Sequence, residues 1–150
     1  ENIIDFNKKV DDKFYYTEKN CKFYNILKES IKNKNTLYQW RRVYVRENKS
    51  NLCPTLTANM GTGGHNVPLV LTKYGIRKLL PKECFLFQGY PEDFILPEEI
   101  AQSHLYKQAG NSVVVPVINR LAKNIMEALK KTDNGIHGGE NEKNYRLFTI

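Results

Sequence analysis

The chain lacks several features that define common protein classes. It has no run of 18 apolar residues, which excludes a membrane-spanning helix, and no signal peptide. No internal repeat is visible, and 150 residues suffice for one core, or for one small domain plus an appendage. The chain starts at Glu1 rather than Met, which indicates a fragment or a trimmed chain.

Cysteine is also scarce. The three cysteines, Cys21, Cys53 and Cys84, are an odd number and lack the spacing of metal ligands. This pattern argues against a disulfide framework or a zinc site, and it predicts reduced cytosolic thiols. The sequence therefore predicts no metal centre.

Positive charge is in excess and is concentrated in one window. The chain has 23 Lys and Arg against 16 Asp and Glu, for a net charge of +7. Between Tyr38 and Lys78 there are seven basic residues and one acidic residue, Glu47, so this window carries +6 and the other 109 residues +1. A localised basic patch is typical of phosphate binding, and the alternative is the solvated surface of a basic protein.

The stretch 38–68 lies at the centre of this window. It holds the only Trp, and its first half alternates like a β-strand. This predicts Trp40, Arg42, Tyr44 and Arg46 on one face, and Arg41, Val43 and Val45 on the other. The second half is rich in Thr, Asn and Gly, which suit a backbone that passes close to a large polyanion. We interpret the stretch as a surface that lies against nucleic acid.

Shorter patterns predict the other elements. Residues 21–33 predict a short helix with Asn20 as its candidate N-cap. Its basic face is either solvated or directed at DNA, and consists of Lys22, Lys28 and Lys32. Residues 69–72 predict a strand, and Pro81 and Gly89 bracket a second short helix.

The longest predicted helix follows Gly110, Asn111 and Ser112, with Pro116 in its first turn. Its apolar stripe consists of Val114, Val117, Ile118, Leu121, Ile125 and Leu129. This stripe packs either on the sheet of the same domain or on a partner surface, and we favour the partner.

Three blocks of the sequence resemble one enzyme family. They are QWRR…PTLTANMGTGGHN from Gln39, RKLLPKECFLFQGYPEDF at 77–94 and YKQAGNSVVVPVINRLAKNI at 106–125. In this order and spacing they are similar to the target-recognition domain and the ninth and tenth conserved blocks of bacterial restriction–modification C5-cytosine DNA methyltransferases. The resemblance covers about residues 38–130.

The resemblance implies transfer of a methyl group from S-adenosylmethionine to carbon 5 of a cytosine that is flipped out of double-stranded DNA. By alignment, Gln39 resembles the side chain that fills the vacated space and pairs with the orphan guanine. Arg42 resembles an arginine that reads a guanine edge. Thr55 resembles a threonine that supports the backbone of the flipped nucleotide. For Gln39 the alternative is an ordinary polar strand residue.

Further DNA contacts are predicted around these three residues. We expect contacts to DNA phosphates from Arg41, Arg46 and Lys49. For the two arginines the alternative is an ion pair with Glu47 or another carboxylate. The predicted surface also includes Thr57, Asn59, Gly61, Gly63 and Gly64. In the family, the corner at Asn111 and Ser112 lines the S-adenosylmethionine pocket; the alternative is that one of them only caps the following helix.

The resemblance also implies a domain organisation within an α+β fold. We expect a small twisted β-rich target-recognition domain over residues 1–80 and a connecting hinge segment over 81–109. A helix over 110–131 would pack on the absent α/β methyltransferase domain, followed by a flexible tail over 132–150. The implied partners are double-stranded DNA and the amino-terminal catalytic domain or subunit, and the implied location is the bacterial cytoplasm.

Three blocks of the family are missing from the chain. There is no Pro-Cys pair for the nucleophile, no Phe-x-Gly-x-Gly cofactor turn and no Glu-Asn-Val block. Cys53 precedes Pro54 in the reverse order, so we reject it as the nucleophile. The chain is therefore expected to be inactive alone, as a fragment or as the specificity subunit of a split enzyme. The rival hypotheses are a freestanding DNA-binding module and an RNA-associated basic domain.

Overall fold

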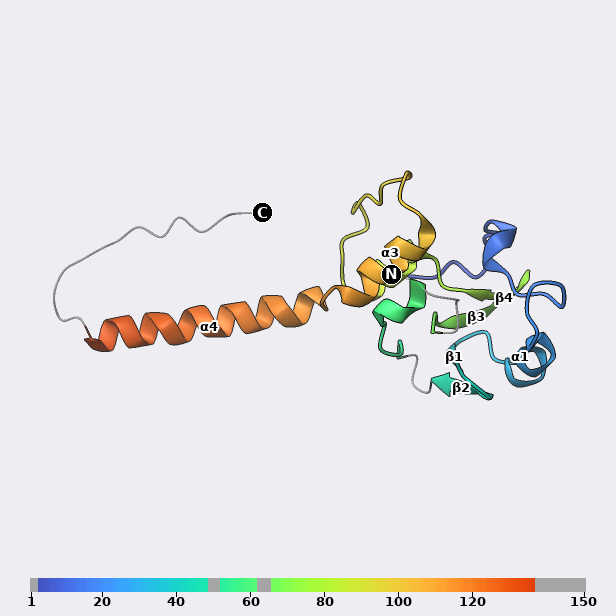
Figure 1. Cartoon of the computed structure of the whole chain (residues 1–150). Coiled ribbons are helices and arrows are strands. Elements are labelled where there is room, and N and C mark those ends of the chain that lie inside the picture. Colours follow the sequence, from blue (N-terminus) through green and yellow to red (C-terminus); the bar gives the residue numbers. More distant parts are fainter. Residues whose placement is uncertain (1–2, 49–51, 62–65, 137–150) are drawn as a thin grey trace. The chain divides into compact units, whose positions relative to one another are not determined.

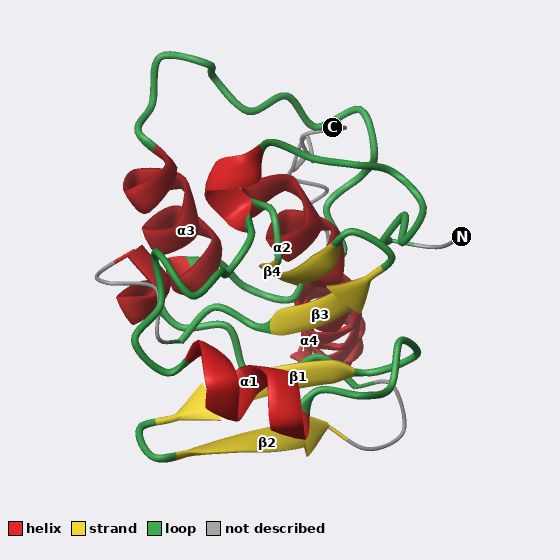
Figure 2. Ribbon diagram, turned by 90° about the vertical axis from the view of Figure 1, so that its right-hand side faces the viewer, coloured by secondary structure: helices red, strands yellow, loops and turns green. Residues whose placement is uncertain are grey.

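The computed structural model describes residues 3–48, 52–61 and 66–136. It divides the chain into two compact units, Glu1–Val115 and Pro116–Ile150. The first unit holds a four-stranded sheet in the order β2-β1-β3-β4 (Figure 2). The elements are η1 (Asp12–Phe14), α1 (Tyr24–Ser30), β1 (Leu37–Arg41), β2 (Tyr44–Asn48), η3 (Ala58–Gly61), β3 (Leu69–Thr72), β4 (Gly75–Lys78), α2 (Pro81–Phe87), α3 (Gln102–Asn111) and α4 (Val115–Ile136) (Figure 1). The expected α+β fold is confirmed.

The central stretch forms a hairpin, and the expectation of one continuous alternating strand was wrong. The chain reverses at Arg42 and Val43, so that Arg41 pairs with Tyr44 and Gln39 pairs with Arg46. Residues directly opposite in an antiparallel pair share one face of the sheet. Arg46 therefore shares a face with Gln39, and Trp40 shares the other face with Val45.

Helix α1 lies inside the expected range, but Asn20 is not its cap. The residue before α1 is Phe23, which makes no side-chain capping bond. Asn20 instead accepts a hydrogen bond from the Thr17 amide at 2.8 Å and donates one to the Tyr15 carbonyl at 2.9 Å. It closes the turn that leads toward the helix.

Each face of the sheet buries its own apolar cluster. The face toward α1 contains Cys21, Leu27, Ile31, Tyr38, Trp40, Leu69 and Ile76. The opposite cluster joins the sheet to η3, α2 and α3, and contains Leu37, Leu56, Met60, Val67, Val70, Leu79, Cys84, Phe85, Tyr106 and Ala109. Burial of apolar area on both sides holds β1 and β3 rigidly in the middle of the sheet.

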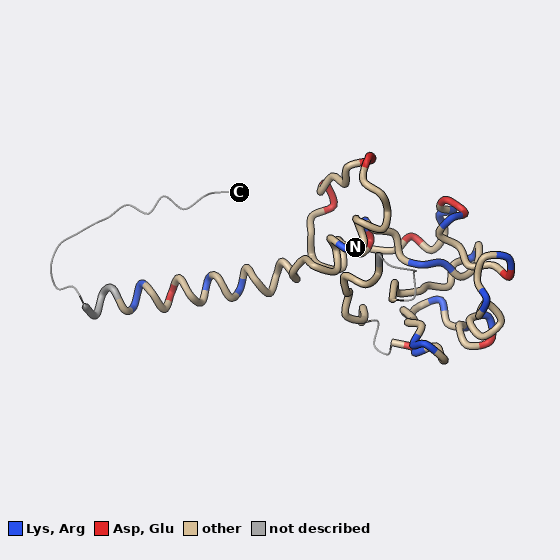
Figure 3. Tube along the Cα trace, in the orientation of Figure 1, with Lys and Arg blue, Asp and Glu red and all other residues tan. Residues whose placement is uncertain are grey.

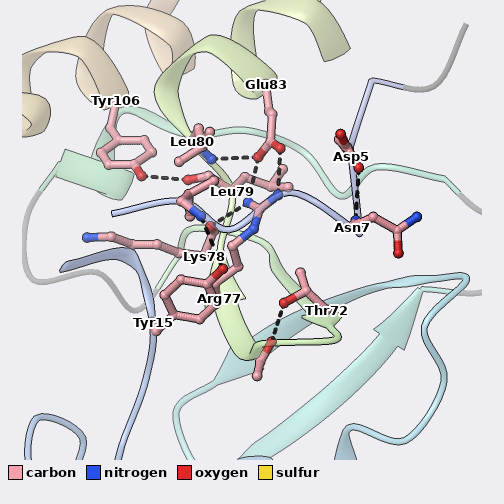
Figure 4. A network of polar contacts seen from close by, with 12 residues as sticks. Asp5, Asn7, Tyr15, Thr72, Arg77, Lys78, Leu79, Leu80, Glu83 and Tyr106 are labelled. Carbon is pink, nitrogen blue, oxygen red and sulfur yellow. Dashed lines mark hydrogen bonds and ion pairs between the residues drawn. The ribbon is translucent and has the colours of Figure 1, made fainter. Parts of the chain in front are cut away.

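Arg77 is fully buried, which removes it from the basic surface that charge counting suggests. Its two terminal nitrogens donate to both carboxylate oxygens of Glu83 at 2.8 and 2.7 Å. Glu83 also accepts from the Leu80 amide at 2.7 Å, and the Tyr106 hydroxyl donates to the Leu79 carbonyl at 2.5 Å (Figure 4). This network ties β4 to the first turn of α2 and to α3, so the block that begins at Arg77 braces the unit.

Gly110 allows α3 to touch the loop that precedes η3. A Cβ atom at this position would lie 2.1 Å from the carbonyl carbon of Thr57 and 2.3 Å from the Ala58 nitrogen. Only glycine permits that approach of two backbones. The expected helical segment over 110–131 belongs to two helices, because α3 continues through Asn111 and α4 begins at Val115.

Helix α4 has Pro116 as its second residue, as expected for a first turn. Its stripe is exposed, with Val117, Ile118, Leu121, Ile125 and Leu129 between 45 and 59% accessible. Packing of this stripe on a partner domain stays a prediction. No helix in the described ranges is both long enough and apolar enough to cross a membrane.

Candidate nucleic-acid interface

A groove of about 750 Å³ brings together most of the predicted DNA-binding side chains. It lies between the β1–β2 hairpin and the loop that follows β2. We call it the target groove; its described lining is Gln39, Arg41, Arg46, Glu47, Asn48, Leu52, Cys53, Pro54, Thr55, Thr57, Asn59 and Asn66. Six of the predicted residues therefore share one concavity although they come from separate segments.

Gln39 lies in the lining of this groove and is only 7% exposed. The Arg41 Nη1 donates to the Gln39 Oε1 at 3.4 Å, which is a long hydrogen bond. The cross-strand neighbour of Gln39 is Arg46. Gln39 is therefore nearly buried, and it borders the groove with only a small part of its surface.

The arginines of the hairpin retain exposed guanidinium groups. Arg41, Arg42 and Arg46 are all exposed on the hairpin, and Figure 3 shows the Lys and Arg positions along the trace. The three ion pairs among the described residues join Lys9 to Asp12, Lys13 to Asp11 and Arg77 to Glu83. Arg41 and Arg46 therefore form no ion pair with Glu47 within the described structure, and their charge can act on a polyanion.

Arg42 lies at the tip of the hairpin and does not line the target groove. Its φ of 61° is the positive value of a left-handed residue, and the Val43 amide donates to the Arg41 carbonyl across it at 2.7 Å. Such a turn is strained for a residue with a Cβ atom. Arg42 and Tyr44 line a second concavity, described below as the outer pocket.

The loop from Cys53 to Gly61 forms the other wall of the groove. Thr55 and Asn59 are exposed and Thr57 is half-buried. Because the backbone at Thr57 rests against Gly110, the position of this wall depends on α3. Gly61 ends η3, whereas Lys49, Gly63 and Gly64 lie outside the described residues.

A smaller cavity of about 370 Å³, here called the loop cavity, adjoins this wall. It is lined by Cys53, Pro54, Thr55, Leu56, Phe87, Gln88, Ser112 and Val114, so Cys53–Thr55 borders both cavities. The Gln88 side-chain amide donates to the Ala109 carbonyl at 3.2 Å, and the Gln88 backbone carbonyl accepts from the Val115 amide at 2.8 Å. Gln88 thus fixes the corner that carries Ser112.

Ser112 and Asn111 occupy different environments. Ser112 is half-buried in the loop cavity, and its hydroxyl donates to the Ala109 carbonyl at 2.8 Å. Asn111 is exposed as the last residue of α3. Val114 directly precedes α4, so neither residue occupies the N-cap position of that helix; Ser112 is the C-cap of α3 and bonds back to it.

Cys53 is unsuited to nucleophilic chemistry. Burial raises the pKa of its thiol to about 12, and its Sγ lies 3.4 Å from the Pro54 carbonyl oxygen. The thiolate is the reactive form, and little of it is present at neutral pH. This environment agrees with the sequence argument that Cys53 is not the nucleophile, because it precedes Pro54 instead of following a proline.

Two residues of the cavities were not singled out in the sequence. Asn66 lines the target groove from the segment before β3, and Gln88 is a buried amide at the end of α2. No local signal marks Gln88, because its partners, the Ala109 carbonyl and the Val115 amide, are distant in sequence.

An open groove with exposed arginines, amides and hydroxyls, built on a rigid sheet, is typical of a surface that binds a polyanion. The family profile described as C-5 cytosine-specific DNA methylase matches residues 1–127. The chain therefore belongs to the C-5 cytosine-specific DNA methylase family.

Individual relatives agree. The chain is 69% identical over 129 residues to the type II methyltransferase M.Bsp6I of Bacillus sp. (strain RFL6), covering 86% of this chain and 41% of that protein. It is 46% identical over 56 residues to the type II methyltransferase M.MspI of Moraxella sp, covering 37% and 13%. It is 26% identical over 126 residues to the type II methyltransferase M.DsaV of Dactylococcopsis salina, covering 84% and 34%. The chain thus spans less than half of each relative, and no solved structure matches it.

Proposed function

We propose that this chain is the target-recognition and carboxy-terminal segment of a DNA (cytosine-5-)-methyltransferase. The observation that carries the proposal is the convergence of Gln39, Arg41, Arg46, Thr55, Thr57 and Asn59 on one groove. The family membership supplies the reaction class. The catalytic part would come from the rest of the same polypeptide or from a separate subunit of a split enzyme.

Within this function the groove holds the duplex. Arg41 and Arg46 contact phosphates, which position the DNA without reading its sequence. Arg42, exposed at the hairpin tip, reads a guanine edge in the major groove, where a bidentate guanidinium contact discriminates by about 1–3 kcal/mol. Gln39 occupies the space that the flipped cytosine leaves, and Thr55 supports the backbone of the flipped nucleotide.

The loop cavity supports a role beside the methyl donor. S-adenosylmethionine, held mainly by the catalytic part, supplies the methyl group. Ser112 fits that role because its half-buried hydroxyl lies in a cavity that also contains Thr55. Asn111 is exposed and available to the same partner. The shared Cys53–Thr55 wall would keep the donor side and the DNA side close together.

A chimera tests the proposal. The matching 129 residues of M.Bsp6I are replaced by those of this chain, and methyl transfer to duplex DNA is measured, with M.Bsp6I itself as the positive control. We expect methylation at carbon 5 of cytosine. A folded chimera that binds S-adenosylmethionine but neither binds nor methylates DNA would contradict the proposal.

Salt dependence and two variants test the division of labour. With about four phosphate contacts, log affinity should fall against log salt with a slope of about −3 to −4. Arg46→Ala should weaken binding to all sequences alike, whereas Arg42→Ala should relax base preference. Identical sequence profiles for the two variants would show that the assigned roles are wrong.

A further inference from the structure

The outer pocket is a second concavity on the same hairpin, with a volume of about 840 Å³. Its described lining is Phe23, Trp40, Arg41, Arg42, Tyr44 and Asn66. Arg41 and Asn66 also line the target groove, so the two concavities adjoin. The described lining of the outer pocket contains no carboxylate, whereas that of the groove includes Glu47.

The chemistry of the outer pocket suits a phosphodiester. The rings of Phe23 and Trp40 stack at 4.2 Å with an interplanar angle of 5°, which gives the pocket a stiff aromatic wall. The Arg41 guanidinium, which lines both concavities, supplies positive charge, while Arg42 borders the pocket and keeps its role at a guanine edge. Tyr44 is 55% exposed beside them, so its hydroxyl is free to donate to an incoming oxygen. Donors and cations without a carboxylate favour an anionic, hydrogen-bond-accepting ligand.

We propose that the outer pocket binds the sugar–phosphate backbone of DNA that flanks the target site. The inference rests on the proposed function, because DNA must first be seated in the adjoining target groove. A duplex held there continues past the groove, and the neighbouring pocket carries charge of the opposite sign. The contact is independent of sequence, since phosphates and sugars are the same at every base pair. The pocket therefore extends the length of DNA that the unit covers, without altering the recognised sequence.

Tyr44→Ala is the informative variant, because Tyr44 lines the outer pocket but not the target groove. Fluorescence anisotropy measures the affinity of the M.Bsp6I chimera for duplexes that contain a sequence the chimera methylates. One duplex has long flanks on both sides of that sequence, and two others have the left or the right flank trimmed. We expect trimming of one flank to lower the affinity of the parent chimera for the duplex by about fivefold, which is the effect of losing about one polar contact. The Tyr44→Ala chimera should bind the long duplex about as weakly as the parent binds the trimmed one. Trimming the same flank should change the affinity of this variant little.

Two further variants separate the pocket from general effects. Tyr44→Phe keeps the ring and removes only the hydroxyl, so loss of the flank response in this variant assigns the contact to a hydrogen bond. Tyr74→Ala removes a comparably exposed tyrosine from the turn between β3 and β4, outside both concavities, and should preserve the flank response.

The outcomes distinguish the two proposals. Failure of the parent chimera to bind any duplex overturns the proposed function and with it the outer pocket. Binding with an equal flank response in the parent and in Tyr44→Ala overturns the outer pocket alone. Circular dichroism of each variant shows whether the fold is retained.

Discussion

Arg42 offers a sharp test, because the same position carries backbone strain and a proposed recognition side chain. Its φ of 61° lies in the left-handed region, where a Cβ atom costs about 1–2 kcal/mol. Arg42→Ala and Arg42→Gly both remove the guanidinium group, but only the glycine variant also removes this strain. The pair therefore separates the backbone from the side chain.

The expected difference in stability is small but measurable. Glycine relieves about 1–2 kcal/mol of strain, and it loses about 0.5–1 kcal/mol because its unfolded chain is more flexible. Taking the midpoints of these two ranges, Arg42→Gly should be about 0.75 kcal/mol more stable than Arg42→Ala. For a chain of this size that difference raises the melting temperature by about 1–4 °C. Urea unfolding followed by the fluorescence of Trp40, the only Trp and only 7% exposed, measures it directly.

DNA binding should respond differently from stability. Both Arg42 variants lack the guanidinium group, so both should lose the same base preference, with an affinity loss of about 1–3 kcal/mol. The reasoning fails if Arg42→Ala is as stable as Arg42→Gly, because the turn would then carry no strain. It also fails if Arg42→Gly binds DNA as tightly as the parent, because the turn rather than the side chain would then matter.

Four further predictions concern the framework and the thiols. Glu83→Gln should lower the free energy of unfolding by about 3–5 kcal/mol in urea titrations, because it leaves the buried Arg77 charge unpaired, and a loss below about 1 kcal/mol would contradict this. Gly110→Ala should abolish DNA binding and reduce stability, because its Cβ would meet the Thr57 backbone, whereas the exposed Lys107→Ala on the same helix should do neither. Burial raises the pKa of all three cysteine thiols, so native protein at pH 8 should react with alkylating reagents much more slowly than urea-unfolded protein. In the unfolded chain the same thiols ionise at a lower pH than in the folded protein. Their contribution to the free energy of unfolding should therefore be full below about pH 8.5 and be lost as pH rises toward the folded pKa values. Equal stability at pH 7 and pH 10 would contradict this.

Local signals were enough to predict some elements. Pro81 and Gly89 bracket α2 because proline fits the first helical turn and glycine fits the positive φ beyond its end; Gly89 has a φ of 82°. The strand at Leu69–Thr72 follows from a short run of apolar residues. In each case the residues that decide the structure are neighbours in sequence, so a pattern of single residues predicts the element.

The features that were missed depend on distant contacts. The turn at Arg42 and Val43 contains none of the usual turn residues, so nothing local marks the reversal. Helix α3 has few apolar residues, and its burial comes from packing on η3 and α2. Arg77 counts as surface charge in a sequence, although Glu83 neutralises it inside the fold. Each of these outcomes was decided by tertiary structure.

The candidate site combines both kinds of information. The resemblance to the family identified Gln39 and Thr55, but not that they share a groove. Their proximity follows from the hairpin reversal and from the contact of Gly110 with Thr57, since one positions the β1–β2 wall and the other positions the loop wall. A groove whose walls are fixed independently can keep its shape before DNA arrives. Such preorganisation lowers the cost of binding, and it leaves more of the contact energy available to offset the unstacking of a flipped base.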